Sequence, residues 1–158
     1  MSTEVTVKKI EPRTVAFILM QGPYDQIEGT FGRLFGWVGQ KGYAPAGPPL
    51  GIYFNSPEQV PPDELLWELQ CPLGGDIPPA EPDASGAGVK RIEGAEVAST
   101  VHKGPFDEVG KTYGMLWEWV NANGYEIVGP SEEVYFSDPC TTPPQELTTE
   151  IRFPVRKK

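Results

Sequence analysis

Two glutamates, Glu68 and Glu150, are the residues of this sequence best placed to do chemistry. They occupy the same position in two similar stretches, PPDELLWELQCP over residues 61–72 and PPQELTTEIRFP over residues 143–154. Apolar residues alternate with other residues along each stretch, which predicts a β-strand whose glutamate points away from the apolar face. A carboxylate on such a face, set among aromatic neighbours, could pair with a cation or transfer a proton.

Burial decides between these two chemistries. Removing a carboxylate from water raises its pKa unless a cation joins it. As a charge, Glu150 could hold a cationic aromatic guest, with cation–π contacts from nearby tyrosines. With a raised pKa, Glu150 could instead act as a general acid or base that directs water onto an electrophile. Alternation alone also allows a third interpretation, in which both glutamates are the exposed, idle half of amphipathic strands.

The same alternation predicts which residues accompany the glutamates. If Ile52 and Trp67 face a helix, the opposite face carries a short set of candidate ligand contacts. These are Tyr53, Leu66 and Glu68 in the first stretch and Tyr135, Thr148 and Glu150 in the second. Trp37 and Trp119 flank the apolar stripes of the predicted helices, so each could line a ligand groove or, as we favour, pack in the core.

The two stretches belong to an internal duplication. Residues 7–73 align with residues 89–155 at a constant offset of 82 without a gap, and about 27 of the 67 aligned pairs are identical. Between the copies, GGDIPPAEPDASGAG has no periodicity, which is typical of an extended, mobile linker. We therefore predict a single domain over residues 1–158, with repeat one at 1–73, a linker at 74–88 and repeat two at 89–158.

Each repeat is expected to form a strand, a helix and two further strands, a βαββ module preceded by a leading strand. The first has predicted strands at Thr3–Ile10, Thr14–Met20, Leu50–Asn55 and Glu64–Cys71 and a helix from Asp25 to about Lys41; the second has strands at Glu96–Lys103, Glu133–Ser137 and Glu146–Phe153 and a helix over Asp107–Ala122. One helix covers only one face of a small sheet. The predicted class is therefore α+β, with an antiparallel sheet, helices on one face and a central ligand groove of pseudo-two-fold symmetry.

The composition and the motifs of the sequence argue against several functional classes. The formal net charge of −9 opposes a nucleic-acid surface, which needs clustered Lys and Arg. Cys71, Cys140 and the single His102 have no zinc-binding spacing, so we expect neither a metal nor a cofactor, and we interpret His102 as structural. The apolar run Val15–Met20 is far too short to span a membrane, and no signal peptide is evident, which predicts a cytoplasmic location.

The order of the motifs resembles a known family over nearly the whole chain. GPYD and GPFD precede the helices, a tryptophan lies late in each helix, Gly-Tyr follows, and Tyr-Phe precedes a last strand with a central Glu before Pro. This order is similar to the GyrI-like small-molecule-binding family. That family includes effector-binding domains of AraC-type and MerR-type multidrug regulators, gyrase-inhibitory proteins and hydrolases of cyclopropane-containing toxins. The resemblance implies paired βαββ modules around a groove, and it assigns the family's glutamate to Glu150, with Glu68 as its internal counterpart.

We therefore predict a stand-alone bacterial protein that captures amphipathic aromatic compounds, cationic ones in particular, in a groove with a glutamate at its base. The alternatives are a hydrolase of strained electrophiles that uses Glu150 and a modulator of a protein partner such as DNA gyrase. No helix-turn-helix accompanies the repeats, so direct DNA binding is not expected. Because Leu66 and Trp67 replace two threonines, we expect the guest to contact the first half and to pair its charge with Glu150.

Overall fold

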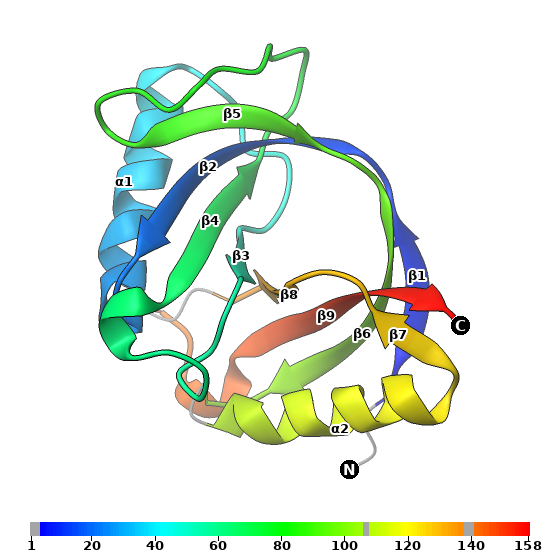
Figure 1. The fold of residues 1–158 in the computed structure, drawn as a ribbon. Helices are drawn as coiled ribbons and strands as arrows, with labels where there is room; N and C mark the ends of the chain where they lie inside the picture. The colour runs from blue at the N-terminus through cyan, green and yellow to red at the C-terminus, as the bar shows by residue number, and fades with distance from the viewer. Residues whose placement is uncertain (1–3, 106–107, 138–140) are drawn as a thin grey trace. The chain divides into compact units, whose positions relative to one another are not determined.

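A computed structural model describes residues 4–105, 108–137 and 141–158 of the chain, which contain nine β-strands and two α-helices (Figure 1). The chain divides into two compact units. The central unit comprises Pro12–Glu93, and the terminal unit comprises Met1–Glu11 together with Gly94–Lys158. No helix among the described residues is long and apolar enough to cross a membrane.

The central unit is a four-stranded antiparallel sheet with one helix against it. Its strands are β2 (Arg13–Gln21), β3 (Leu50–Tyr53), β4 (Leu66–Pro72) and β5 (Ala87–Ile92), in the order β3-β4-β2-β5. The helix α1 (Ile27–Gln40) follows the short 3₁₀ turn Tyr24–Gln26, and a second 3₁₀ turn, Pro62–Glu64, leads into β4. Leu34 and Val38 of α1 pack with Trp67 and Leu69 of β4 in a buried core. The core explains the sequence pattern, because every second residue of β4 is turned to the helix.

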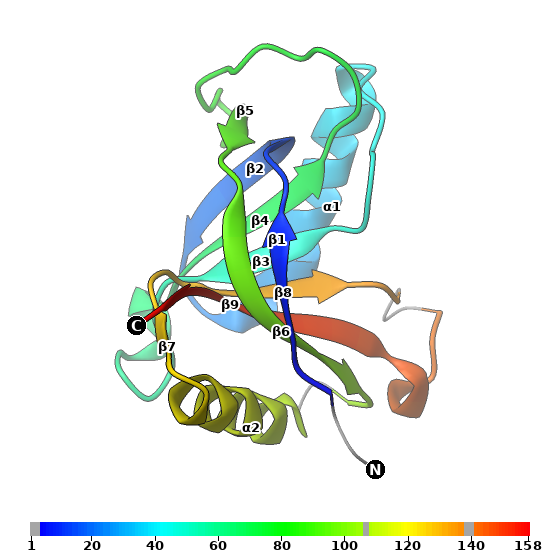
Figure 2. The ribbon, with the colours of Figure 1, turned by 90° about the vertical axis from the view of Figure 1, so that its right-hand side faces the viewer.

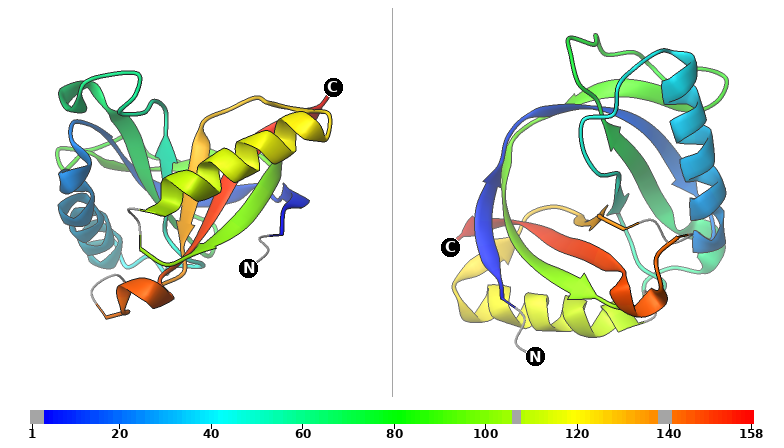
Figure 3. Two further views of the ribbon diagram at one scale, coloured as in Figure 1. Left: turned by 90° about the horizontal axis from the view of Figure 1, so that it is seen from below. Right: turned by 180° about the vertical axis from the view of Figure 1, so that it is seen from behind.

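The terminal unit follows the same plan with different residues. Its strands are β1 (Thr6–Ile10), β6 (Ala95–Lys103), β9 (Thr148–Lys157) and β8 (Ser131–Tyr135), which neighbour one another in that order, and β7 (Tyr125–Ile127), which also pairs with β9. The helix α2 (Val109–Ala122) lies across one face of this sheet (Figure 3), where Leu116 and Val120 pack on Ile151 and Phe153. Asp107, at which this helix was expected to begin, lies outside the described residues.

The leading strand of each repeat pairs within the unit that contains most of the other repeat. Strand β1 lies alongside β6, with Val7 opposite Ala98, as Figure 2 shows. Strand β5 lies alongside β2, with Val89 opposite Ala16. The boundaries of the compact units therefore differ from the boundaries of the sequence repeats, because the sequence similarity does not specify which strand a leading strand will pair with.

Much of the segment expected as a linker is held to the central unit. Ala80 forms an isolated bridge with Val89, and Trp37 Nε1 on α1 donates a hydrogen bond of 2.7 Å to Asp83 Oδ2. Arg33 donates a further hydrogen bond to the carbonyl oxygen of Ser85.

The fold class predicted from the sequence, α+β with antiparallel strands, is confirmed. Strand β7 was not predicted, because Tyr125–Ile127 is too short for alternation to stand out.

Candidate functional site

The register of the sheets places both glutamates on the face opposite the helix, which we call the glutamate face of each unit. Glu68 on β4 lies opposite Leu19 and Ile52, and Glu150 on β9 lies opposite Val101 and Val134. Both glutamates are buried: Glu68 is only 4% exposed and Glu150 only 6%. The interpretation of these glutamates as an exposed polar face is therefore wrong.

Glu68 is paired with Lys90, a residue of β5 in the same unit. The Nζ atom of Lys90, on β5, lies 2.7 Å from Glu68 Oε1. Gln70 Nε2, two residues along β4, donates a hydrogen bond of 2.6 Å to Glu68 Oε2. The ammonium of Lys90 also lies over the ring of Phe17, 4.3 Å from its centroid. Among the described residues, the side-chain partners of Glu68 are thus one cation and one neutral donor.

Glu150 has two cationic partners. Lys8 Nζ, from β1, lies 3.0 Å from Glu150 Oε2, and Arg152 Nε donates to the same oxygen at 2.5 Å. Arg152 also reaches Glu132, with 3.8 Å between Nη1 and Oε1. Burial acts to raise the pKa of Glu150, but the hydrogen bonds and charges of Arg152 and Lys8 outweigh it and hold the pKa below 4.5. Glu150 therefore meets the condition under which the pKa of a buried carboxylate does not rise, because cations join it.

These two arrangements correspond position by position in the repeats. Lys8 and Lys90 stand at the same position, and Arg152 stands where the first repeat has Gln70. The exchange of leading strands brings each lysine to its glutamate, Lys8 within the terminal unit and Lys90 within the central unit. Sequence reasoning missed both lysines, although their place in the matching motifs VKKIE and VKRIE was a signal.

The two tyrosines do not share a face with the glutamates, which corrects the expectation from the sequence. Tyr53 lies opposite Trp67 and Tyr135 lies opposite Thr149, so both point to the helix side of their sheets. Alternation shows that a strand has two faces, but only its register against the next strand decides which residues take each face. In the central unit it is Ile52, next to Tyr53, that shares the face of Glu68.

The other predicted contacts lie in two environments. Leu66 and Thr148 are partly buried and lie two residues from their glutamates on the glutamate faces. Trp37 is buried in the core of the central unit. Trp119 packs against the core of the terminal unit and stacks on Tyr125 with 6.0 Å between ring centroids. The packing of both tryptophans agrees with the core interpretation, and their role toward a ligand stays a prediction.

A third carboxylate, Glu133, was not singled out from the sequence. It lies on the helix side of β8, where Tyr113 donates to Oε2 at 2.5 Å and Tyr135 donates to Oε1 at 3.0 Å. Burial raises the pKa of Glu133, although both tyrosine hydroxyls and the charge of His102 act to lower it. Its counterpart in the first repeat is Gly51, so the duplication carried no signal for it.

His102 and the cysteines have structural surroundings. His102 Nε2 lies 2.9 Å from the carbonyl oxygen of Pro105, which can only accept, so this nitrogen carries a proton. Its Nδ1 lies 2.8 Å from the hydroxyl of Thr112. Burial raises the pKa of the Cys71 thiol, and Cys140 lies outside the described residues. Within the described ranges, no group of three or more His, Cys, Asp or Glu side chains is arranged to hold a metal ion.

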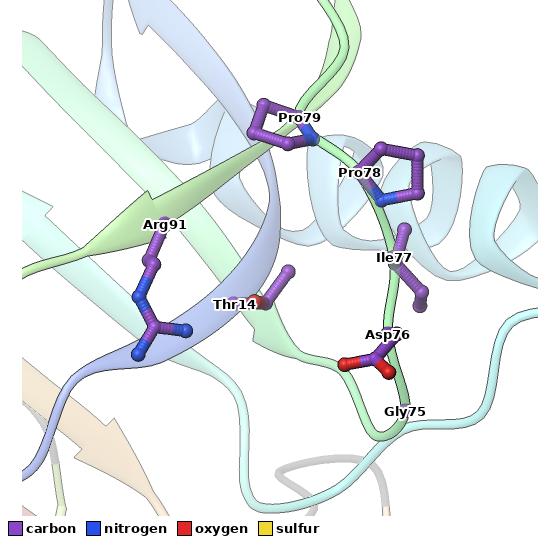
Figure 4. Close-up of a pocket in the computed structure, with 7 residues that line it drawn as sticks. All are labelled: Thr14, Gly75, Asp76, Ile77, Pro78, Pro79 and Arg91. Atoms are coloured by element: carbon purple, nitrogen blue, oxygen red, sulfur yellow. The ribbon is translucent and has the colours of Figure 1, made fainter.

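The central unit also contains a cavity of about 350 Å³ (Figure 4). Thr14 and Arg91, which face each other across β2 and β5, form one side of it. The loop Gly75–Pro79 forms the other, with the carboxylate of Asp76 across from Arg91 in the close-up. The residues that line this cavity include none of the ligand contacts predicted from the sequence.

Comparisons with known proteins identify relatives over the whole length of the chain. The family model described as the GyrI-like small molecule binding domain matches residues 3–156. A protein named DNA gyrase inhibitor from Erwinia billingiae (strain Eb661) is 29% identical over 163 residues, covering 99% of each chain. The crystal structure of the EcmrR C-terminal domain matches with a TM-score of 0.84 at 20% identity over 100% of both chains. The structure of SAV2435 bound to tetraphenylphosphonium matches with a TM-score of 0.61 at 14% identity, over 97% of this chain and 94% of that one.

Proposed function

Because the chain belongs to the family of GyrI-like small-molecule-binding domains, we propose that it captures amphipathic aromatic compounds, cationic ones in particular, on its glutamate faces. One observation carries the proposal. In each unit a buried carboxylate on the face opposite the helix already holds an ammonium group, that of Lys90 against Glu68 and that of Lys8 against Glu150. A carboxylate that pairs with an ammonium of the chain has the charge to pair with the cationic group of a ligand.

The surroundings of the two carboxylates suit an amphipathic guest. Leu19 and Val101, directly opposite Glu68 and Glu150, are 51% and 50% exposed. Exposed apolar side chains beside a buried charge offer hydrophobic contact to the body of a ligand whose cationic group reaches the carboxylate. Tetraphenylphosphonium, the ligand of SAV2435, combines these two properties and is therefore a suitable probe.

The enzymatic alternative, hydrolysis of a strained electrophile, would use Glu150 as an acid or base. Its lowered pKa keeps the carboxylate ionised at neutral pH, which suits charge pairing better than proton donation. The other alternative, modulation of a protein partner such as DNA gyrase, is supported by the name of one relative. That alternative predicts association with gyrase that survives the loss of both glutamates.

The test is a titration with tetraphenylphosphonium and with neutral triphenylphosphine oxide, followed by calorimetry, for wild type, Glu68→Gln, Glu150→Gln and the double variant. We expect the double variant to bind the cation roughly 5- to 150-fold more weakly, as for loss of a buried charge partner, and the neutral compound nearly unchanged. An equal loss for both compounds, or no binding of the cation by wild type, would contradict the proposal. Mass spectrometry of the recovered ligands separates capture from hydrolysis, since a hydrolase returns products that have gained one water.

A further inference from the structure

Lys90, in the central unit, places its ammonium group between a carboxylate and an aromatic ring. Lys90 Nζ is 2.7 Å from the Glu68 carboxylate and 4.3 Å from the centroid of the Phe17 ring. A carboxylate and an aromatic ring around one cation are the two groups that hold alkylammonium ligands in proteins. The Lys90 side chain is 37% exposed, so its flexible stem can carry the ammonium into water without movement of the backbone.

Gln70 adds an unused acceptor to this position. Its Nε2 donates to Glu68, which fixes the orientation of the amide. Its Oε1 is buried and has no hydrogen-bond partner among the described residues, and the whole residue is only 3% exposed. A buried acceptor without a donor is costly, and a ligand that brings an N–H group would relieve this cost.

The matching position of the terminal unit is built differently. Ser99 stands where the central unit has Phe17, and its hydroxyl donates to the carbonyl oxygen of Thr6. Arg152 stands where the central unit has Gln70, and it binds Glu150 from a side chain only 13% exposed. Displacing Lys8 would therefore leave Glu150 still neutralised, and Ser99 would offer the new cation no ring in place of Phe17.

From this difference we propose that Lys90 is a tethered occupant of a cation site formed by Glu68, Gln70 and Phe17, and that protonated aromatic amines bind the central unit by displacing it. The inference rests on the proposed function and names the ligand class and the competitor at one of its two glutamates. It also moves the charge of the guest from Glu150, where the sequence led us to expect it, to Glu68. Lys90 then competes with every ligand for this site. Only a cation that binds the site more tightly than the Lys90 ammonium does will displace it.

The experiment compares benzylammonium with benzyltrimethylammonium, which has no N–H group, and with neutral benzyl alcohol, by calorimetric titration of the full chain. Lys90→Met removes the competitor, and Lys8→Met is the matched control at the same position of the other repeat. We expect Lys90→Met to bind benzylammonium roughly 2- to 5-fold more tightly than wild type, the size expected for removal of a partly exposed ion pair. Lys8→Met should give a smaller gain, because Arg152 still neutralises Glu150.

Three further variants test the components of the site. Glu68→Gln in the Lys90→Met background should abolish the gain, and Phe17→Leu should weaken both cations but not benzyl alcohol. Lys90→Arg, which keeps a cation in place, should not show the gain. If Gln70 Oε1 receives the ligand's N–H group, benzylammonium should bind Lys90→Met more tightly than benzyltrimethylammonium does, and equal affinity would overturn the role of Gln70.

A measurement on the wild-type chain keeps the proposal testable if Lys90→Met folds poorly. With lysine labelled by ¹³C at Cε, the NMR signal of Lys90, assigned from the spectrum of Lys90→Arg, should shift on addition of benzylammonium by more than the signal of Lys8 does. An unshifted Lys90 signal, or an unchanged affinity of Lys90→Met, in a protein that binds tetraphenylphosphonium would overturn the tethered lysine and leave the proposed function standing. Absence of binding of any cation by wild type and by every variant would overturn both.

Discussion

The Nζ atom of Lys8 on β1 lies 3.0 Å from Oε2 of Glu150 on β9, so a residue near the start of the chain neutralises a carboxylate near its end. This contact depends on the pairing of β1 with β6, and Lys90 makes the equivalent contact with Glu68 through the pairing of β5 with β2. The exchanged leading strands therefore have an electrostatic role as well as a role in sheet formation. Each supplies the counter-ion for a buried glutamate.

The two cations at Glu150 should contribute unequally to stability. Arg152 is 13% exposed and contacts both Glu150 and Glu132, whereas Lys8 is 38% exposed and contacts Glu150. We expect Arg152→Met to lower the free energy of unfolding by about 3 kcal/mol, since it removes a cation from the buried Glu150, and Lys8→Met by about 1 kcal/mol or less. Urea denaturation of the two variants checks the order. Equal effects would mean that Arg152 is not the principal counter-ion.

Trp67 should be one of the most sensitive positions in the central unit. It is completely buried, and its Nε1 donates a hydrogen bond of 2.9 Å to the carbonyl oxygen of Gly22. Trp67→Ala should cost about 3–5 kcal/mol of unfolding free energy, because it leaves a cavity and an unpaired carbonyl. Trp117 on α2, 55% exposed, is the control, and its replacement by Ala should change stability by about 0.5 kcal/mol or less. Thermal and urea denaturation measure both.

Asp83 should give the protein an acid-dependent step in stability. Hydrogen bonds from Ser85 and from the Trp37 indole lower the pKa of Asp83 from 3.8 to about 2. Because the folded state favours the ionised form, the stabilisation is present above pH 3.8 and is lost as the pH falls through about 2. We expect the difference in unfolding free energy between wild type and Asp83→Asn to shrink over that interval. A difference that stays constant with pH would show that the charge of the Asp83 carboxylate has no part in holding residues 74–88 to the central unit.

Glu133 should produce a pH dependence of the opposite sign. Burial raises its pKa above 4.5, so the folded state favours the protonated form. Stability linked to this group is present below pH 4.5 and is lost as the pH rises through the raised pKa. Glu133→Gln should therefore gain in stability relative to wild type as the pH is raised from the acid range to neutrality.

Glu118→Gln, which makes the same substitution at an exposed carboxylate of α2, is the matched control for Glu133→Gln. Replacing Tyr113 or Tyr135 by Phe removes a hydrogen bond that favours the ionised carboxylate. Either change should deepen the loss of stability at neutral pH, as measured by chemical denaturation at several pH values. If the tyrosine variants reduced that loss, the hydroxyls would not be stabilising the charge.

Several features of the fold and site could be predicted before the structure because they rest on local patterns. The spacing of Leu34 and Val38 predicted α1 and its buried stripe, and the alternation around Trp67 predicted β4 with Glu68 on the opposite face. Periodicity shows which residues of one helix or strand share a face, and the sequence of that element is enough to read it. The face of the glutamates was therefore predicted correctly, while their burial was left open.

Most of the features that could not be predicted involve pairs of elements. The face of Tyr53 depends on the register of β3 against β4, and a change of one residue would exchange Tyr53 with Ile52. The partner of β1 depends on which sheet edge it meets, for which VKKIE and VKRIE carry no distinguishing signal.

The sequence by itself determined the duplicated elements and the position of one glutamate in each last strand, because periodicity and repetition are properties of neighbours along the chain. Only the tertiary structure decided that Lys8 and Lys90 neutralise those glutamates, since an ion pair between distant strands depends on pairing that no local pattern contains. The same pairing settled the ionisation of Glu150. A carboxylate takes its pKa from the charges and water around it, and these are arranged by the fold.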